Sequence, residues 1–425
     1  MTSQTAPQGI SRFGVSGYRD WKLRNKLIFA FFAVIALLAA SFGFIGLPQI
    51  TNALLTVGAN SLVSSANSTA SSIDQYMTDK IEDISTASKL PEFTTYLTNP
   101  NDAAASQNAL RALQAFAARS DYESVALVDG TSLKAILSSS QSDVGTDLSF
   151  RDYVIEAMKG STFASDPSVS VVTNRPAMFF SAPIKDAAGK VIGVVRSRLN
   201  LNGIWGLVEK DKNAEGPGTY GMLLDQNGIR IANSLSLGRR DEMEGSLLLY
   251  TAIAPLSPSV AKALVDEKRF GKATSTEVQV VAMPDVANAL VTPGIKSFET
   301  ASDVTPELHQ AAVSSLSNKP WRYVLMTPIS TFTAAADNLR NFLGLVILVV
   351  GGLALVAAYL MARGITEPIL KLTQAADRIS LGELDTKIDV DRKDEVGELA
   401  EAVSRMQASL QAAIERLRAR RTVTK

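Results

Sequence analysis

The chain has no cysteine and only one histidine, His309, among its 425 residues. The absence of thiols excludes disulfides, thiolate metal sites and cysteine nucleophiles. A single imidazole cannot build the multi-histidine sites of many zinc and iron enzymes, so only carboxylate-bound calcium or magnesium stays open. Neither sign of charge dominates, because 42 Lys and Arg residues balance 42 Asp and Glu residues. Nucleic acid is therefore a poor candidate partner, and nothing in the composition indicates a cofactor or a metal.

Two long segments contain no charged residue at all. Leu27 to Leu47 comprises 21 residues, and Asn341 to Ala362 comprises 22. A helix of either length reaches about 30 Å, which is the thickness of the hydrocarbon core of a bilayer. Helices buried in soluble domains seldom stay apolar for so long, so we prefer membrane spans to the alternative of two core helices. The sequence thus predicts a two-pass membrane protein in contact with lipid.

The charges beside the first span predict its orientation. Residues 1–26 carry five basic residues and one acidic residue, Asp20. Because basic segments stay on the cytoplasmic side, both termini are expected there, in the cell (inner) membrane. The apolar stretch is longer than the roughly 7 to 15 residues of a signal peptide, so we interpret it as an uncleaved anchor. Residues 50–338 are then expected outside the cytoplasm.

This outer region begins with a helical pattern. Residues 50–89 carry one apolar stripe at Ile73, Met77, Ile81 and Ile84, which are spaced by four, four and three positions. That spacing places all four side chains on one face of a helix. We therefore predict a long stalk helix.

Short apolar and β-branched runs follow, separated by polar turns, and they predict strands. The predicted strands are 122–128, 177–184, 191–199, 220–224, 229–232 and 321–326. A repeated small-Pro-Ile step, at 182–184 and 327–329, suggests two related modules in tandem. We place the membrane-distal module at 90–210 and the membrane-proximal module at 219–338.

Beyond the second span, residues 363–417 carry two narrow apolar seams joined by an extended connector. The first seam has Pro368 near the start of its helix, where proline is tolerated, and it breaks at Gly382. The second seam begins at Val396. Helices this short and narrowly apolar need partners, so we predict a four-helix bundle made by a homodimer, which the resemblance described next implies to be parallel, followed by a basic tail at 418–425.

The segment resembles a HAMP domain. Pro368, the Gly382-Glu383-Leu384 step and the run Asp394-Glu395-Val396-Gly397-Glu398-Leu399 carry the resemblance. In that family, two parallel helices in each chain relay signals from a membrane span, and apolar connector residues clamp the bundle. The resemblance implies signal-relay roles for Pro368, Leu372, Gly382, Leu384, Ile388, Glu395, Val396, Gly397, Leu399, Val403 and Met406.

Residues 50–338 resemble a double Cache sensor, in which a long helix precedes two PAS-like modules and the membrane-distal module holds the ligand. The best match is Phe150-Arg151-Asp152-Tyr153. Family members that bind amino acids grip the carboxylate with an arginine and an aromatic residue two positions later. The expected fold class is therefore α+β. The implied ligand-binding residues are Arg151, Tyr153, Asp166, Phe180, Arg196 and Arg198.

One departure from the family pattern bears on the ligand. The acid that binds the ligand amine in the family aligns with Arg198, and two like charges about 4 Å apart repel by about 4 kcal/mol at an effective dielectric constant of about 20. We therefore predict an anionic, carboxylate-like ligand without an essential amine, held by Arg151 and Arg198. Strand alternation places Arg196 on the same face as Arg198. The alternative is that these two strand arginines are solvated surface charges.

No catalytic motif is present, so we do not expect an enzyme. The chain ends about eight residues after the last seam residue, Leu417, and no output domain is expected. The leading hypothesis is a transmembrane receptor that senses a small outer solute and signals to a separate cytoplasmic partner. The alternatives are a membrane-anchored binding protein that serves a transporter, the input half of a split chemoreceptor or histidine kinase, and an enzyme with an unrecognised outer site.

Overall fold

The computed structural model of the protein describes residues 21, 23–119, 121–235, 250–267, 269 and 278–423. Most of the predicted N-terminal tail and the end of the predicted basic tail lie outside these residues. The chain forms two compact units. The larger unit spans 52–334, and the smaller one combines the described residues of 1–51 and 335–425.

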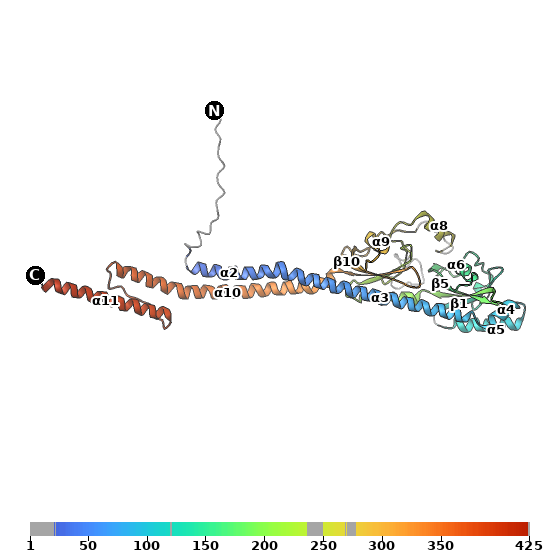
Figure 1. Ribbon diagram of the computed structural model, residues 1–425, viewed down its shortest axis with the longest axis horizontal. Coiled ribbons are helices and arrows are strands. Elements are labelled where there is room, and N and C mark those ends of the chain that lie inside the picture. Colours follow the sequence, from blue (N-terminus) through green and yellow to red (C-terminus); the bar gives the residue numbers. More distant parts are fainter. Residues whose placement is uncertain are drawn as a thin grey trace, which may run out of the picture. The chain divides into compact units, whose positions relative to one another are not determined.

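The predicted stalk is a helix that supplies one wall of the larger unit's core. The helices of this part of the chain are α2 (Leu23–Ser41), the π-helical turn η1 (Phe42–Gly46) and α3 (Leu47–Ala87). On α3, Leu62, Ala66, Ile73, Met77 and Ile84 are fully buried. Their spacing of four and seven residues forms one stripe, and both sheets of the larger unit pack against it in a single core. Figure 1 shows α3 running past both sheets.

The first module contains a six-stranded sheet. Its helices are α4 (Pro91–Thr98), α5 (Ala103–Ala117), the 3-10 turn η2 (Gln141–Asp143) and α6 (Asp152–Met158). Its strands are β1 (Tyr122–Asp129), β2 (Ala135–Ser138), β3 (Phe163–Ala164), β4 (Ser168–Val169), β5 (Pro176–Lys185) and β6 (Val191–Asn200). They are ordered β2-β1-β6-β5-β3, with β4 also on β5, and the predicted β5–β6 hairpin is confirmed.

The second module contains a five-stranded sheet in the order β8-β7-β11-β10-β9. Its strands are β7 (Tyr220–Leu224), β8 (Arg230–Asn233), β9 (Ser297–Ala301), β10 (Leu308–Ser315) and β11 (Arg322–Pro328). Its described helices are α7 (Asn202–Glu209), α8 (Pro258–Asp266) and α9 (Pro284–Val291).

The two sheets share one strand order, in which β1 corresponds to β7 and β6 to β11. The small-Pro-Ile repeat does not follow this correspondence, because 182–184 lies on β5 and 327–329 lies at the end of β11. A three-residue match was too short to identify equivalent strands. The tandem arrangement therefore depends on the topology of the sheets and not on that repeat.

The smaller unit contains most of α10 (Ile329–Ser380) and all of α11 (Glu395–Val423). Gly382 adopts φ +95° just after α10, a conformation that favours glycine, and it ends the helix. Asp394 accepts a hydrogen bond from the Gly397 N–H (3.2 Å) and caps α11. A side chain at Gly397 would collide with the carbonyl oxygen of Arg392, so the close approach of connector and helix requires glycine there.

Pro368 corrects one expectation, because it lies inside α10 and not near the start of a helix. Proline cannot donate to the carbonyl four positions earlier, which is that of Gly364. Arg392 replaces the missing donor, with its Nη1 2.6 Å from the Gly364 oxygen. Gln407 holds the other end of the connector through bonds to the carbonyls of Leu384 (2.6 Å) and Thr386 (2.8 Å). These contacts make α11 parallel to the end of α10, as predicted.

Among the described residues, two helical stretches are long and apolar enough to cross a membrane. They are Asn25–Ala87, which includes most of α2 and all of α3, and Ile329–Ser380, which is α10. Each contains one of the uncharged segments identified in the sequence.

Candidate functional site

A small cavity of about 30 Å³ lies at the N-terminus of α6, where the predicted Arg151 and Tyr153 meet residues of the second module. Its wall is formed by Phe150, Arg151, Asp152, Tyr153, Ser165, Asp166, Ser168, Glu267 and Arg269. A larger cavity of about 380 Å³ shares Asp152, Asp166, Glu267 and Arg269 with it. The two cavities thus meet at the junction of the two modules.

Arg151 is the buried cation of this cavity. It is 5% exposed, and its Nη1 donates to the carbonyl oxygen of Glu267 (3.2 Å). The guanidinium group lies over the rings of Phe150 (5.0 Å) and Phe179 (5.9 Å). Its Nε has no hydrogen-bond partner, and no carboxylate of the described chain forms an ion pair with it. A buried cation with unused donors is stabilised by an anion, so this side chain is suited to hold a carboxylate.

Tyr153 forms part of the wall behind Arg151. Its ring stacks on Phe179 at a centroid distance of 4.8 Å, and burial raises the pKa of its hydroxyl. Its backbone oxygen accepts a bond from the Ser181 hydroxyl (2.6 Å), which ties α6 to β5. Tyr153 therefore fixes the first turn of α6 on the sheet and keeps Arg151 in place.

Asp166 joins the cavity to the second module. Gln226 (2.8 Å) and Trp321 (3.1 Å) donate side-chain hydrogen bonds to its carboxylate, and the Lys319 ammonium lies 3.2 Å away. Burial raises the pKa of Asp166, but the charges of Lys319 and Arg269 outweigh it and hold that pKa below the usual range. The residue is therefore an ionised anchor between the modules, and its carboxylate is already occupied.

Arg196 and Arg198 do not line the cavity but form a buried cluster around Asp143, in which the Arg196 guanidinium lies 5.7 Å from the same Phe179 ring that Arg151 contacts. The Asp143 carboxylate is 3.0 Å from Arg196 Nη2 and 2.7 Å from Arg198 Nη1, and it accepts a bond from the Ser124 hydroxyl (2.6 Å). Burial raises the pKa of Asp143, but the two guanidinium groups outweigh it and lower that pKa. Arg198 also pairs with Glu123 (3.1 Å).

This cluster bears on whether the ligand can carry an amine. Because two carboxylates neutralise Arg196 and Arg198, the expected repulsion of a ligand amine by Arg198 loses its physical basis. The alternative of solvated surface charges is wrong too, since the two arginines are only 1% and 2% exposed. Their shared face is confirmed by their shared partner, while Val195 and Leu199 lie in the core on the opposite face.

Phe180 lies on the other side of the sheet from Arg151. It belongs to the core that packs on α3, whereas its neighbour Phe179 packs with Tyr153. The pairing of Phe179 with Arg198 across β5 and β6 explains this, because directly paired residues share a face. The alternation of the predicted hairpin therefore indicates that Phe179, and not Phe180, lies on the face that packs against Tyr153.

Three charged residues of the cavity wall, Asp152, Glu267 and Arg269, were not expected from the sequence to bind the ligand. Asp152 stands inside the quoted motif, but nothing in the local pattern marks Glu267 or Arg269. Burial raises the pKa of Asp152, and burial followed by the Asp152 charge raises that of Glu267. These two carboxylates therefore carry unfavourable negative charge at the cavity, which a ligand ammonium group or protonation would relieve.

Residues 49–336 match the Cache domain family, and residues 360–412 match the HAMP domain. The chain belongs to the Cache domain family. The first match covers more than half of the chain and coincides with the α3 helix and the two sheets, which confirms the resemblance seen in the sequence. Cache and HAMP domains are sensory and signal-transducing rather than catalytic. Together with two candidate membrane-crossing helices, they indicate a membrane receptor.

Solved structures and curated relatives agree with this assignment. The sensor domain of the Vibrio cholerae histidine kinase DctB has the same fold, with 14% identity and a TM-score of 0.52 over 64% of this chain and 96% of that one. The Bacillus subtilis methyl-accepting chemotaxis protein TlpA is 33% identical over 76 residues, or 18% of this chain. Protein IcfG of Synechocystis is 34% identical over 82 residues, or 19% of this chain. These matches span 12% and 13% of the two relatives' lengths.

Proposed function

We propose that this Cache protein is a two-pass receptor of the cell (inner) membrane that binds a small carboxylate outside the cytoplasm. The signal would pass through the HAMP domain of a homodimer to a separate cytoplasmic partner. The observation that carries the proposal is Arg151, a buried cation that lines a cavity, has an Nε without a hydrogen-bond partner and forms no ion pair with a carboxylate of the described chain. A bound carboxylate would complete its charge-assisted bonds.

The carboxylates of Asp152 and Glu267 favour a second candidate, a zwitterionic amino acid. Its carboxylate would bind Arg151, and its ammonium group would lie beside the two acids whose pKa values are raised. The matched pair L-lactate and L-alanine separates the two candidates, because these molecules differ chiefly in the amine.

Titration calorimetry of the full chain in lipid nanodiscs should give measurable binding of L-lactate or succinate, and the same measurement with L-alanine shows whether an amine adds affinity. Lowering the pH protonates Asp152 and Glu267 sooner than ordinary carboxyl groups, because their pKa values are raised. An anion without an amine should therefore bind more tightly as the pH falls from about 7 to about 5. A preference for L-alanine that weakens over the same pH range would reject the amine-free ligand and favour the zwitterion.

Asp166 offers a route from the cavity to the second span. It lines the cavity and also binds Lys319 and Trp321, which precede β11, and β11 continues directly into α10. A ligand that shifts Asp166 or Arg269 would therefore move the strand that leads into the helix. Such a ligand needs only a few kcal/mol of differential affinity for the two arrangements.

Asp166→Asn should uncouple binding from signalling. Asparagine keeps the shape but removes the charge that pairs with Lys319, so the ligand should still bind within about threefold while the response at the HAMP domain falls by more than half. The response is measured as ligand-dependent cross-linking in HAMP. The control is Glu156→Gln, which changes a surface acid of the same module whose ion pair within the described residues is with the neighbouring Lys159. An unchanged response in Asp166→Asn would exclude this route.

The second HAMP seam is the surface for the proposed dimer. Leu399, Met406 and Leu410 of α11 are 48%, 47% and 42% exposed in the single chain, although their spacing forms one apolar stripe. Leu399→Cys should therefore form a disulfide between protomers in membranes, and its yield should change when ligand is added. Glu401→Cys, two positions away, is the control and should cross-link at least about fivefold less. Equal yields at both positions would contradict the dimer.

A further inference from the structure

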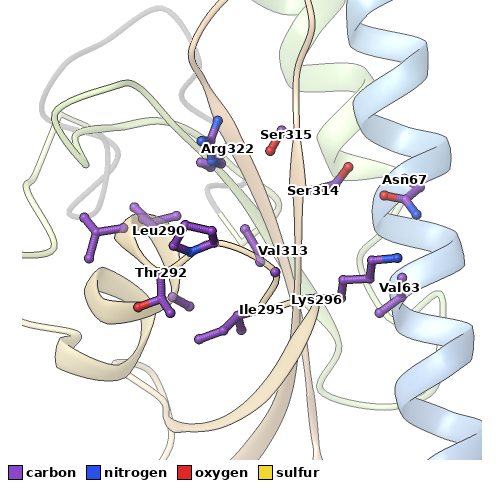
Figure 2. A pocket seen from close by; sticks show the side chains of 14 residues that line it. Val63, Asn67, Leu290, Thr292, Ile295, Lys296, Val313, Ser314, Ser315 and Arg322 are labelled. Atoms are coloured by element: carbon purple, nitrogen blue, oxygen red, sulfur yellow. The ribbon is translucent and has the colours of Figure 1, made fainter.

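A groove of about 430 Å³ opens in the second module and shares no residue with the cavity around Arg151. It lies between α3, the loop from α9 to β9, and the ends of β10 and β11 (Figure 2). Its wall includes Val63, Asn67, Leu290, Lys296, Ser315 and Arg322.

The groove exists because β9 is shorter than its neighbour. Ser297, the first residue of β9, pairs with Ala312, whereas β10 continues to Ser315. One residue beyond this last pair, the Val313 N–H donates a hydrogen bond to the Lys296 carbonyl oxygen (3.0 Å). Alternate residues of a strand direct their backbone groups to the same side, so the Ser315 N–H points past the start of β9 into the groove. The unpaired end of β10 thus offers a backbone donor.

The charge of the groove is positive. Arg322 and Lys296 contribute cations, and none of the described residues that line the groove is acidic. Arg322 donates only to the carbonyl of Trp321 (3.3 Å), and within the described ranges neither cation forms an ion pair. By contrast, Arg230 and Arg269 of the same module pair with Asp303 and Asp225, both at 2.8 Å. The groove therefore retains two cations that no carboxylate of the described residues neutralises.

Apolar side chains complete the wall. Val63 of α3, Leu290 of α9 and Val313 of β10 line the space between polar groups such as the Asn67 amide. Figure 2 draws Lys296 next to Val63 and Asn67, and Arg322 on the side of Leu290. A molecule that fits these surroundings carries a negative charge and an apolar body.

We propose that this groove is a second ligand site, specific for a small organic anion with an apolar body, such as an aromatic carboxylate. The occupant lies against α3 and the sheet of the second module together, so it biases how the helix packs on that sheet. This role is separate from the proposed carboxylate site, because the two sites share no lining residue.

Benzoate is the probe, and benzamide, which has the same ring without the charge, is the matched control ligand. The experiment uses the full chain in nanodiscs and carries Arg151→Gln throughout, so that the first site cannot contribute. We expect benzoate to bind and benzamide to bind at least about tenfold more weakly. Adding Arg322→Gln should weaken benzoate about tenfold or more, and adding Lys296→Gln about threefold, since that lysine is exposed.

Two further variants keep the result interpretable. Arg322→Lys retains the charge and should lose only about threefold, which separates loss of the cation from loss of the fold. Lys262→Gln removes an exposed lysine of α8 and should leave benzoate binding unchanged. The proposal is overturned if benzoate gives no binding at about 10 mM, if benzamide binds equally well, or if neither Arg322→Gln nor Lys296→Gln weakens benzoate.

Discussion

Asp143→Asn is expected to destabilise the Cache unit by about 3–5 kcal/mol, because it leaves two buried guanidinium groups without their shared carboxylate. The Asp143 side chain is fully buried, and the Arg196 and Arg198 side chains are 1% and 3% exposed. Water therefore cannot take over the solvation of the two cations. Thermal unfolding followed by circular dichroism should show a midpoint lowered by roughly 10 °C.

The matched control is Glu123→Gln, which removes the other carboxylate that Arg198 contacts. The Glu123 side chain is 21% exposed, so solvent screens the pair and its loss should cost less than about 1 kcal/mol. Similar small shifts in both variants would show that Asp143 is not the main support of the cluster.

The pH dependence of folding stability tests the role of the Asp143 carboxylate independently. Because the two arginines hold the pKa of Asp143 below its ordinary value of 3.8, the ionised form stabilises the fold. That contribution is complete above the unfolded-state pKa and disappears as the pH falls through the lower folded-state pKa. The wild-type chain should thus lose stability below about pH 4, and Asp143→Asn should show a smaller acid-dependent loss.

The sequence predicted those features of the protein that depend on local patterns. The two uncharged segments follow from local composition, and the stripe on α3 and the β5–β6 hairpin follow from the spacing of neighbouring apolar residues. The structure contains all of these features. The ends of the HAMP connector could also be predicted from local residues. A side chain would be strained at Gly382 and would collide with the backbone at Gly397.

The errors arise where the deciding partner is distant in the sequence. Arg198 was interpreted without Asp143, which lies 55 residues earlier and neutralises it. Asp166 meets Trp321 across 155 residues, and no local pattern indicates that pairing. Pro368 was placed near a helix start because the rule for proline is local, while Arg392, which satisfies the carbonyl that Pro368 leaves free, is 28 residues from that carbonyl.

Arg151→Gln should have an effect opposite to that of Asp143→Asn. Removing the charge-assisted bonds to a buried ligand carboxylate should cost about 2–5 kcal/mol of binding, so calorimetry should show affinity lowered at least about 30-fold. The ligand-free protein should lose little stability, because Arg151 is buried without a carboxylate partner in the described chain and its desolvated charge is unfavourable there. Its melting temperature should be unchanged or raised.

Two variants make this contrast decisive. Arg175→Gln changes an exposed arginine of the same module and should leave both binding and melting unchanged. Arg151→Lys keeps the charge but loses the planar fork, so it should retain only part of the affinity. If Arg151→Gln instead lowered the melting temperature as much as Asp143→Asn does, Arg151 would be a structural residue of the α6 turn. A buried cation that weakens the empty protein and strengthens the occupied one is what a receptor needs, since the ligand then contributes a stabilisation that only the bound state has.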